Sequence, residues 1–353
     1  MAVDRGGAHG PLVELTLARL RQFVREPEAI FWTFAFPILM AVAMTVAFPN
    51  RAAAPVRVVV ADGDGGPDAA AAMRRALTAT PAITLRTLAP GAEARALREG
   101  EVHLIVVPGT PPTYRYDPSR DESRVARLVV DDVLQRGAGR SDPWQARDET
   151  LQVPGSRYVD WLLPGLIGMT IMGTGMWGLG FSITQARMQH LLKRFLASPM
   201  QRRDYLAAQL LARMVFLAPE VAIPLGFGVI ALGMPVHGSV AAITVVSAAG
   251  ALAFGAIGLL AASRARTIEG ISGVLNVVML PMWMLSGVFF SSANYPAAAQ
   301  PAIRLLPLTA LVDALRVVVL DGSGLGAVVP ELAVLVAWTV FGFAAALRLF
   351  RWR

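Results

Sequence analysis

The stretch that decides the fold is Pro281-Met-Trp-Met-Leu-Ser-Gly-Val-Phe-Phe290, followed by Ser291-Ser-Ala-Asn-Tyr-Pro296. An apolar run begins before it at Ile268, and another follows it over Gly326–Leu349. A spanning helix needs about 20 mostly apolar residues. The pattern therefore predicts one span, then two short re-entrant half-helices over 291–323, then a last span. This order of segments indicates a membrane transport protein.

The composition agrees with a membrane protein. Hydrophobic residues make up 55% of the chain and charged residues only 16%, whereas soluble domains carry about 25% charged residues. No cysteine is present, which excludes disulfides and thiolate metal sites. The net charge of +7 comes largely from basic residues between the apolar runs, so we expect no nucleic-acid partner.

Six apolar runs are long enough to span a bilayer. The predicted spans are 29–48, 158–184, 205–232, 239–262, 268–290 and, within 324–353, Gly326–Leu349. Arg and Lys cluster before span one, between spans two and three, between spans four and five, and after span six. With six spans these clusters share one face, which the positive-inside rule makes cytoplasmic, together with both termini. The sequence thus predicts an α-helical polytopic membrane protein with six transmembrane helices.

The segment 49–157 then lies on the outer side of the membrane. Short strand patterns alternate in it with helical patterns. The expected strands are Val56–Val60, Ile83–Thr87, Val102–Val107 and Tyr114–Tyr116, and the expected helices are Ala69–Thr78, Ala92–Glu99 and Ser123–Arg136. We therefore expect a small α/β extracytoplasmic domain between transmembrane helices one and two.

Three motifs have plainer explanations than a catalytic or ligand site. Gly173-Thr-Gly-Met-Trp-Gly178 matches a dinucleotide fingerprint, but it lies inside an apolar span without a preceding strand, so close helix packing is favoured. Asp62-Gly-Asp64 fails as a calcium loop and indicates a turn, because Pro67 occupies the required glycine position. The four histidines lack metal-ligand spacing. No metal site and no hydrolytic centre are expected.

Two amphipathic segments lie beside predicted spans. Within 1–28, Leu12–Arg25 predicts an interfacial helix leading into span one. Within the loop 185–204, a second short helix has an apolar face flanked by basic residues and ends at a proline. Its residues are Leu191, Leu192, Lys193, Arg194, Phe195, Leu196 and Pro199. It is suited either to the bilayer surface or to a partner's groove.

Polar residues inside the spans are candidates for function, because an unpaired carboxylate there costs at least about 2.5 kcal/mol. Glu220 lies in span three, near Pro219 and Pro224. It either lines a transport path or pairs with Arg213, two helical turns away, as a structural lock. Asn276 in span five is a second path candidate, with an interhelical hydrogen bond as the alternative.

These residues resemble the membrane subunits of ABC-2 type exporters, which carry drugs, lipids or polysaccharides. The resemblance covers essentially the whole chain. It is carried by Arg25-Glu-Pro27, Leu192-Lys-Arg-Phe-Leu-Ala-Ser-Pro199, Leu285-Ser-Gly-Val-Phe-Phe290, Leu306-Pro-Leu-Thr309 and Asp313-Ala-Leu-Arg316. Relatives often have an Arg-Glu pair and a glycine in the loop, where Met188 and His190 stand here.

The resemblance implies a half-transporter in the bacterial inner membrane, paired with a second permease copy as a homodimer or heterodimer. The 188–199 loop would be a coupling helix docked on a separate cytoplasmic ABC ATPase, and Leu12–Arg25 an elbow helix. ATP and Mg would be bound by that ATPase, since this chain has no Walker A sequence and is not expected to be an enzyme. Pro307, Asp313 and Arg316 would shape an outer gate.

The expected function is outward movement of a hydrophobic or amphipathic substrate, with drug, lipid and glycan left open. The alternative is a membrane-anchored receptor or scaffold that presents the outer domain and needs no ATPase.

Overall fold

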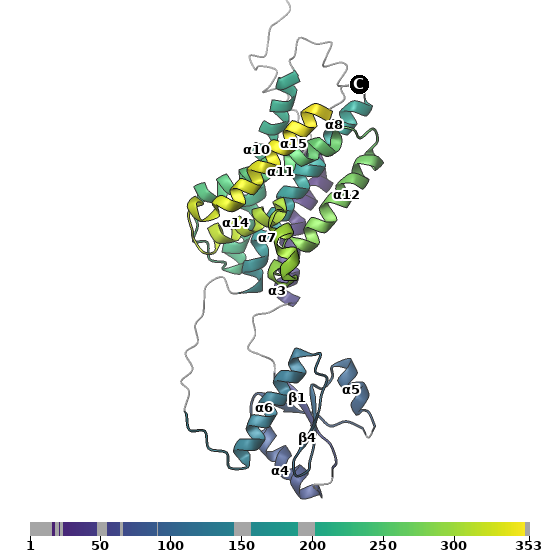
Figure 1. The fold of residues 1–353 in the computed structure, drawn as a ribbon, viewed down its shortest axis with the longest axis vertical. Helices are drawn as coiled ribbons and strands as arrows, with labels where there is room; N and C mark the ends of the chain where they lie inside the picture. Colours follow the sequence, from purple (N-terminus) through teal and green to yellow (C-terminus); the bar gives the residue numbers. More distant parts are fainter. Residues whose placement is uncertain are drawn as a thin grey trace, which may run out of the picture. The chain divides into compact units, whose positions relative to one another are not determined.

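The computed structural model describes residues 16–17, 21, 24–47, 55–63, 66–89, 91–144, 157–189 and 202–349, without the side chains of 202–208 and 210. The chain forms two compact units (Figure 1). The helical unit comprises Met1–Pro49 and Gln152–Arg353, and the sheet unit comprises Asn50–Leu151. Each unit has its own hydrophobic core.

The sheet unit is built on a four-stranded sheet with the order β2-β1-β3-β4. Its strands are β1 (Val56–Val60), β2 (Ile83–Leu85), β3 (Leu104–Val107) and β4 (Thr113–Arg115), and its helices are α4 (Gly66–Thr78), α5 (Glu93–Glu99) and α6 (Asp121–Gly137). β1 pairs in parallel with β2 and β3, while β4 pairs antiparallel with β3. Helices connect the parallel strands, as such connections require.

Alternation along β1 gives the sheet two buried faces. Val58 and Val60 join the core formed with α4 and α6, whereas Val59 joins the core formed with α5. Successive strand side chains point to opposite faces, so a nearly continuous apolar strand is the expected sequence for such a sheet. The unit is therefore a three-layer α/β sandwich.

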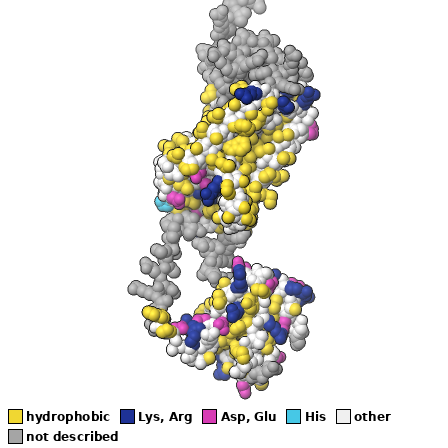
Figure 2. All heavy atoms as spheres, in the orientation of Figure 1, with side chains coloured by type: hydrophobic (Ala, Val, Ile, Leu, Met, Phe, Trp, Pro, Cys, Tyr) yellow, Lys and Arg dark blue, Asp and Glu magenta, His cyan; other side chains and the backbone are white. Residues whose placement is uncertain are grey.

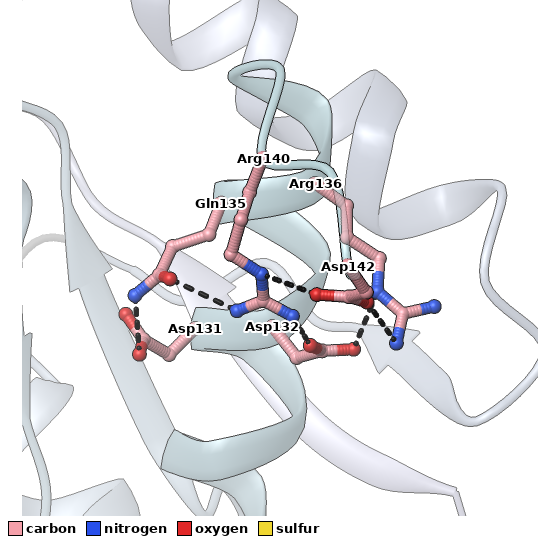
Figure 3. A network of polar contacts seen from close by, with 6 residues as sticks. All are labelled: Asp131, Asp132, Gln135, Arg136, Arg140 and Asp142. Atoms are coloured by element: carbon pink, nitrogen blue, oxygen red, sulfur yellow. Dashed lines mark hydrogen bonds and ion pairs between the residues drawn. The ribbon is translucent and has the colours of Figure 1, made fainter. Parts of the chain in front are cut away.

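An exposed polar network closes the C-terminal end of α6 (Figure 3). Arg140 donates to Asp132, to Asp142 at 2.9 Å and to Gln135 at 2.9 Å. Arg136 bonds to Asp132 and Asp142 as well, at 3.1 and 3.2 Å. The network holds the turn after α6 against the last turns of the helix.

Among the described residues, the helical unit contains six helices that are long and apolar enough to cross a membrane. The first span joins α2 (Pro27–Ile30), a π-helical turn η1 (Phe31–Ala35) and α3 (Phe36–Ala47), and the second joins α7 (Tyr158–Gly173), a π-helical turn η2 (Thr174–Gly178) and α8 (Leu179–Met188). The others are α10 (Arg202–Leu232), α11 (Val240–Ala262), α12 (Ile268–Leu285) and η5 (Leu325–Val328) with α15 (Val329–Leu349). The fold is that of a polytopic helical membrane protein.

α11 is the central helix of this unit. It packs against α15, α14, α10, α12 and the α7–α8 span. Its apolar stretch is 61% buried, second to the 72% of the span Tyr158–Met188 and far above the 17% of the span that ends in α15. Figure 2 shows hydrophobic side chains over much of one face of the helical unit. Outward-facing apolar side chains on such helices fit a lipid environment rather than water.

The segment between α12 and η5 contains short helices. They are η3 (Ser292–Asn294), η4 (Ala297–Ala299), α13 (Gln300–Arg304) and α14 (Pro307–Val319), of which α14 is largely buried. α12 ends at Leu285, short of the expected boundary at Phe290. The reason is local, because Gly287 has a φ of +74°, a left-handed conformation that ends helices.

Two expected helices lie largely or wholly outside the described residues. Of the Leu12–Arg25 segment, only 16–17, 21, 24 and 25 are described. The coupling-helix residues Leu191, Leu192, Lys193, Arg194, Phe195, Leu196 and Pro199 all lie outside them. Both segments stay predictions.

Candidate functional site

Two buried charges of the helical unit lie on α10. Arg213 is 6% exposed and Glu220 is 1% exposed. Seven residues correspond to about two helical turns, which places both side chains on the same face of the helix. Pro219 and Pro224 lie within α10 and remove two backbone donors beside Glu220. The charged pair is therefore enclosed in apolar surroundings.

Arg213 and Glu220 form an ion pair through Nη1 and Oε2. The Thr174 hydroxyl donates to the other carboxylate oxygen of Glu220 at 2.5 Å. Arg213 Nη2 donates to the carbonyl oxygen of Ile171 at 3.2 Å. The network thus joins α10 to the α7–η2 junction, and the pairing that the sequence offered as one alternative is present.

One strong donor of Arg213 is not used by this network. Arg213 Nε is buried and has no hydrogen-bond partner within the described part of the chain. Buried polar atoms normally find a protein or water partner. The network can therefore accept one further acceptor group while its carboxylate stays neutralised by the guanidinium.

Close helix packing explains only part of the glycine motif, which includes the π-helical turn η2 beside this network. A Cβ added at Gly175 would lie 2.9 Å from the Cβ of Phe254 on α11. At Gly173 and Gly178 an added Cβ would meet nothing within 4 Å. Close helix packing, which the sequence favoured for the whole motif, therefore accounts for Gly175 alone. Thr174, between the glycines, serves the buried carboxylate instead.

A second cluster surrounds Arg316 on α14. The guanidinium carbon lies 3.7 Å from the centre of the Trp161 ring on α7, which is a cation–π contact. Arg316 Nε donates to the Trp161 carbonyl at 3.2 Å, and Nη2 donates to the Gly287 carbonyl at 2.6 Å. Tyr158 donates to the carbonyl of Phe289 at 2.9 Å. Together these bonds hold α7 and α14 to the turn after α12.

The other two gate candidates have lesser contacts. Asp313 lies 3.6 Å from Arg316, with 40% of its side chain exposed. Pro307 occupies the first turn of α14, where its missing N–H costs nothing. The structure therefore brings Asp313 and Arg316 together, while Pro307 serves as a helix start.

Asn276 is exposed on α12. Its side chain makes no hydrogen bond to another described residue. The interhelical hydrogen bond that the sequence suggested is therefore not formed within the described part of this chain.

An arginine at each end of the second span binds a neighbouring helix terminus. Arg157 pairs with buried Asp160 at 2.7 Å and donates to the carbonyls of Leu232 and Gly233 at the end of α10. The bond to Asp160 raises the pKa of Arg157 above its usual value, so the side chain stays charged. Arg187, at the other end of the span, donates to the carbonyls of Ala262, Ser263 and Ala265 at and just after the end of α11.

Sequence reasoning missed Thr174, Trp161, Arg157 and Arg187 as members of these contacts. Arg157 and Arg187 did carry a signal, because each lies at the edge of a predicted span where a cation can bind helix carbonyls. Trp161 and Thr174 carried none, since which side chain faces them depends on the three-dimensional packing.

Six apolar helices, buried charged pairs and short helices before the last span define the membrane subunit of a transport system. The chain belongs to the ABC-2 family of transporter proteins, whose family description matches residues 27–348. Permeases of this family generally work with ATPase subunits.

Curated relatives are similar over part of the chain. The inner membrane transport permease YadH of Escherichia coli strain K12 is 29% identical over 167 residues. The match covers 46% of this chain and 63% of that relative. YadH proteins of Escherichia coli O157:H7 and Shigella flexneri match to the same extent. No solved structure matches the chain. The family match and the six apolar helices of the described residues support a multi-pass membrane protein.

Proposed function

We propose that this chain is the permease subunit of an ABC exporter, and that a separate ATPase drives it through the loop after α8. The observation that carries the proposal is the length of the second span. Tyr158–Met188 contains 31 residues, which as helix extends about 46 Å. The hydrocarbon core is only about 30 Å thick. One end of the span therefore extends beyond the apolar layer, in keeping with a loop at 190–201 that is accessible to a partner.

The apolar face of that loop supports an ATPase as the partner. Leu191, Leu192, Phe195 and Leu196 are spaced to form one side of a short helix, and Lys193 and Arg194 flank it. A helix of this kind docks into a partner's groove through its apolar anchors. ATP and Mg would be bound by the ATPase. Family membership and the absence of a Walker A sequence from this chain both favour this division of labour.

For the path, we propose that the buried network of Glu220 is opened and closed as α10 and the α7–η2 junction move. Its two charges neutralise each other, so a mainly apolar cargo can pass without facing an isolated charge. The unused donor of Arg213 can bind one polar group of that cargo. These features favour a hydrophobic or amphipathic substrate, with drug, lipid and glycan as the classes to be tested.

The exposed amide of Asn276 supports pairing with a second permease copy. An unbonded amide in contact with hydrocarbon costs roughly 2–7 kcal/mol, depending on the reference state. A second copy packed against α12 would satisfy it. With both termini in the cytoplasm, the sheet unit would lie on the outer side and the Arg316 cluster would form part of the outer gate.

Co-purification tests the proposal directly. The tagged chain, purified from native membranes in mild detergent, should bring along a stoichiometric protein that contains a Walker A motif. The variant Phe195→Asp should lose that protein, because a carboxylate replaces the central apolar anchor. Phe195→Leu is the matched control and should retain it. A clean preparation of the parent chain, with no ATPase, would instead favour a receptor or scaffold.

A further inference from the structure

Arg187 holds the end of one spanning helix to the end of another. It lies in the last turn of α8, directly before the loop at 190–201. Its guanidinium donates to the carbonyl oxygens of Ala262 at 3.0 Å and Ser263 at 3.3 Å, and also to that of Ala265. Ala262 is the last residue of α11. One side chain thus gathers three carbonyls at and just beyond the terminus of the central helix.

Helix chemistry explains why this contact is strong. The last four carbonyls of a helix lack partners within the helix, and their dipoles give the terminus a partial negative charge. An arginine supplies both the donors and the opposite charge. α8 ends normally next to it, with the Gln189 amide bonded to the Gln185 carbonyl at 2.9 Å. The loop therefore begins at a terminus that is already fixed to α11.

The packing along the two helices leaves little room for sliding. A Cβ added at Gly258 on α11 would lie 2.9 Å from the Cα and the carbonyl oxygen of Met176 on η2. At Gly255 it would lie 3.1 Å from a methyl of Leu179. Backbone atoms in direct contact cannot pass each other as flexible side chains can. The junction between η2–α8 and α11 is therefore closely packed along its length.

Close packing of α11 also extends toward the Arg316 cluster. An added Cβ at Gly250 of α11 would lie 2.7 Å from the Leu311 side chain of α14. α14 also carries Arg316, which bonds α7 and the turn after α12. A rigid connection thus runs from the end of α8, through α11, to the opposite part of the bundle.

We propose that Arg187 is a positioning residue that makes α8 and α11 move as one body when the loop at 190–201 is displaced. Without it, displacement of the loop is absorbed by bending at the end of α8. The inference rests on the proposed function, because it presumes an ATPase that pushes the loop. It adds the residue through which the push reaches the central helix.

The absence of cysteine makes a direct test practical, because thiol-reactive labels attach only where a cysteine is introduced. Two nitroxides are attached to one chain that carries both Gln189→Cys and Arg266→Cys. Both positions are exposed, the first directly after α8 and the second in the connection that follows α11. The labelled chain is combined with its co-purifying ATPase in lipid nanodiscs. The spin–spin broadening is then recorded without nucleotide and with Mg-ATP plus vanadate.

With Arg187 present, the broadening should be the same in both nucleotide states. In Arg187→Gln the broadening should be lost in the vanadate state while the ATPase remains bound and active. In Arg187→Lys part of the broadening should remain. The matched control is Arg264→Gln. It removes an exposed arginine from the short connection between α11 and α12, and it should behave as the parent.

A change of broadening in the parent between nucleotide states would overturn the inference, as would an Arg187→Gln variant that keeps the broadening constant. If Arg187→Gln does not fold, Arg187→Lys takes its place: it should lose part of the broadening in the vanadate state, and constant broadening in it would overturn the inference. Failure to recover any ATPase with the parent chain would refute the proposed function first, and the inference with it. A bound, active ATPase with independent motion of α8 and α11 would refute the inference alone.

Discussion

Replacing the buried pair of Arg213 and Glu220 with methionine, singly and together, tests whether the network is a charge-neutral unit. Glu220 is 1% exposed and Arg213 is 6% exposed, so neither charge can turn to water when its partner is removed. Breaking a buried pair by removing one partner costs about 3–5 kcal/mol, whereas replacing both by apolar residues of similar volume is often neutral. We therefore expect two destabilised single variants and a double variant near the parent.

The magnitudes can be followed by thermal unfolding in lipid nanodiscs, using the fluorescence of the 7 tryptophans. A loss of 3–5 kcal/mol corresponds to a fall in Tm of roughly 6–20 °C. With each single variant costing about 3–5 kcal/mol and the double variant near the parent, the coupling energy from the double-mutant cycle should be about 6–10 kcal/mol, above the range of about 0.5–3 kcal/mol that is usual for residues in one network. Thr174→Val should cost only about 0.5–3 kcal/mol, because it removes one hydrogen bond to the carboxylate. Single variants that each cost under about 1 kcal/mol and simply add would refute the reasoning.

Four further predictions concern single residues of the two units. Arg316→Ala should lower stability by about 2–4 kcal/mol, since it loses charged hydrogen bonds and the stacking on Trp161, and an unchanged Tm would contradict this. Gly258→Ala should cost about 1–3 kcal/mol because the added methyl meets backbone. Gly173→Ala, with open space around it, should be neutral or stabilising by up to about 1 kcal/mol, so equal effects at both glycines would contradict the packing described. Burial, with a smaller effect of Arg57, lowers the pKa of His103 below 6.5; the sheet unit should therefore lose stability as the pH falls below about 6.5, because the unfolded chain binds the proton more readily. Hydrogen exchange of β1 and β3, corrected for intrinsic rates, should show that loss in the parent and not in His103→Asn.

The helices of the fold were largely readable from sequence, because a run of about 20 apolar residues has few alternatives to a membrane span. The pairing of Glu220 with Arg213 could be offered from their spacing as one of two alternatives, since both lie on one helix. Partners that lie on other helices could not be inferred from spacing in the sequence. The carbonyls that receive Arg316 and the hydroxyl of Thr174 face their partners only once the bundle is packed. The end of α12 was also missed, because the apolar run continues past Gly287 while the backbone turns there.

The sheet unit is an insertion between two helices of the bundle, and this connectivity has an evolutionary consequence. α3 precedes it, α7 follows it, and these two helices pack against each other. A segment whose two ends return to adjacent helices can be gained, lost or exchanged in a single genetic event that leaves the bundle intact. Its core is separate from that of the helices, so its sequence is free to diversify at its own rate while the membrane machinery stays the same.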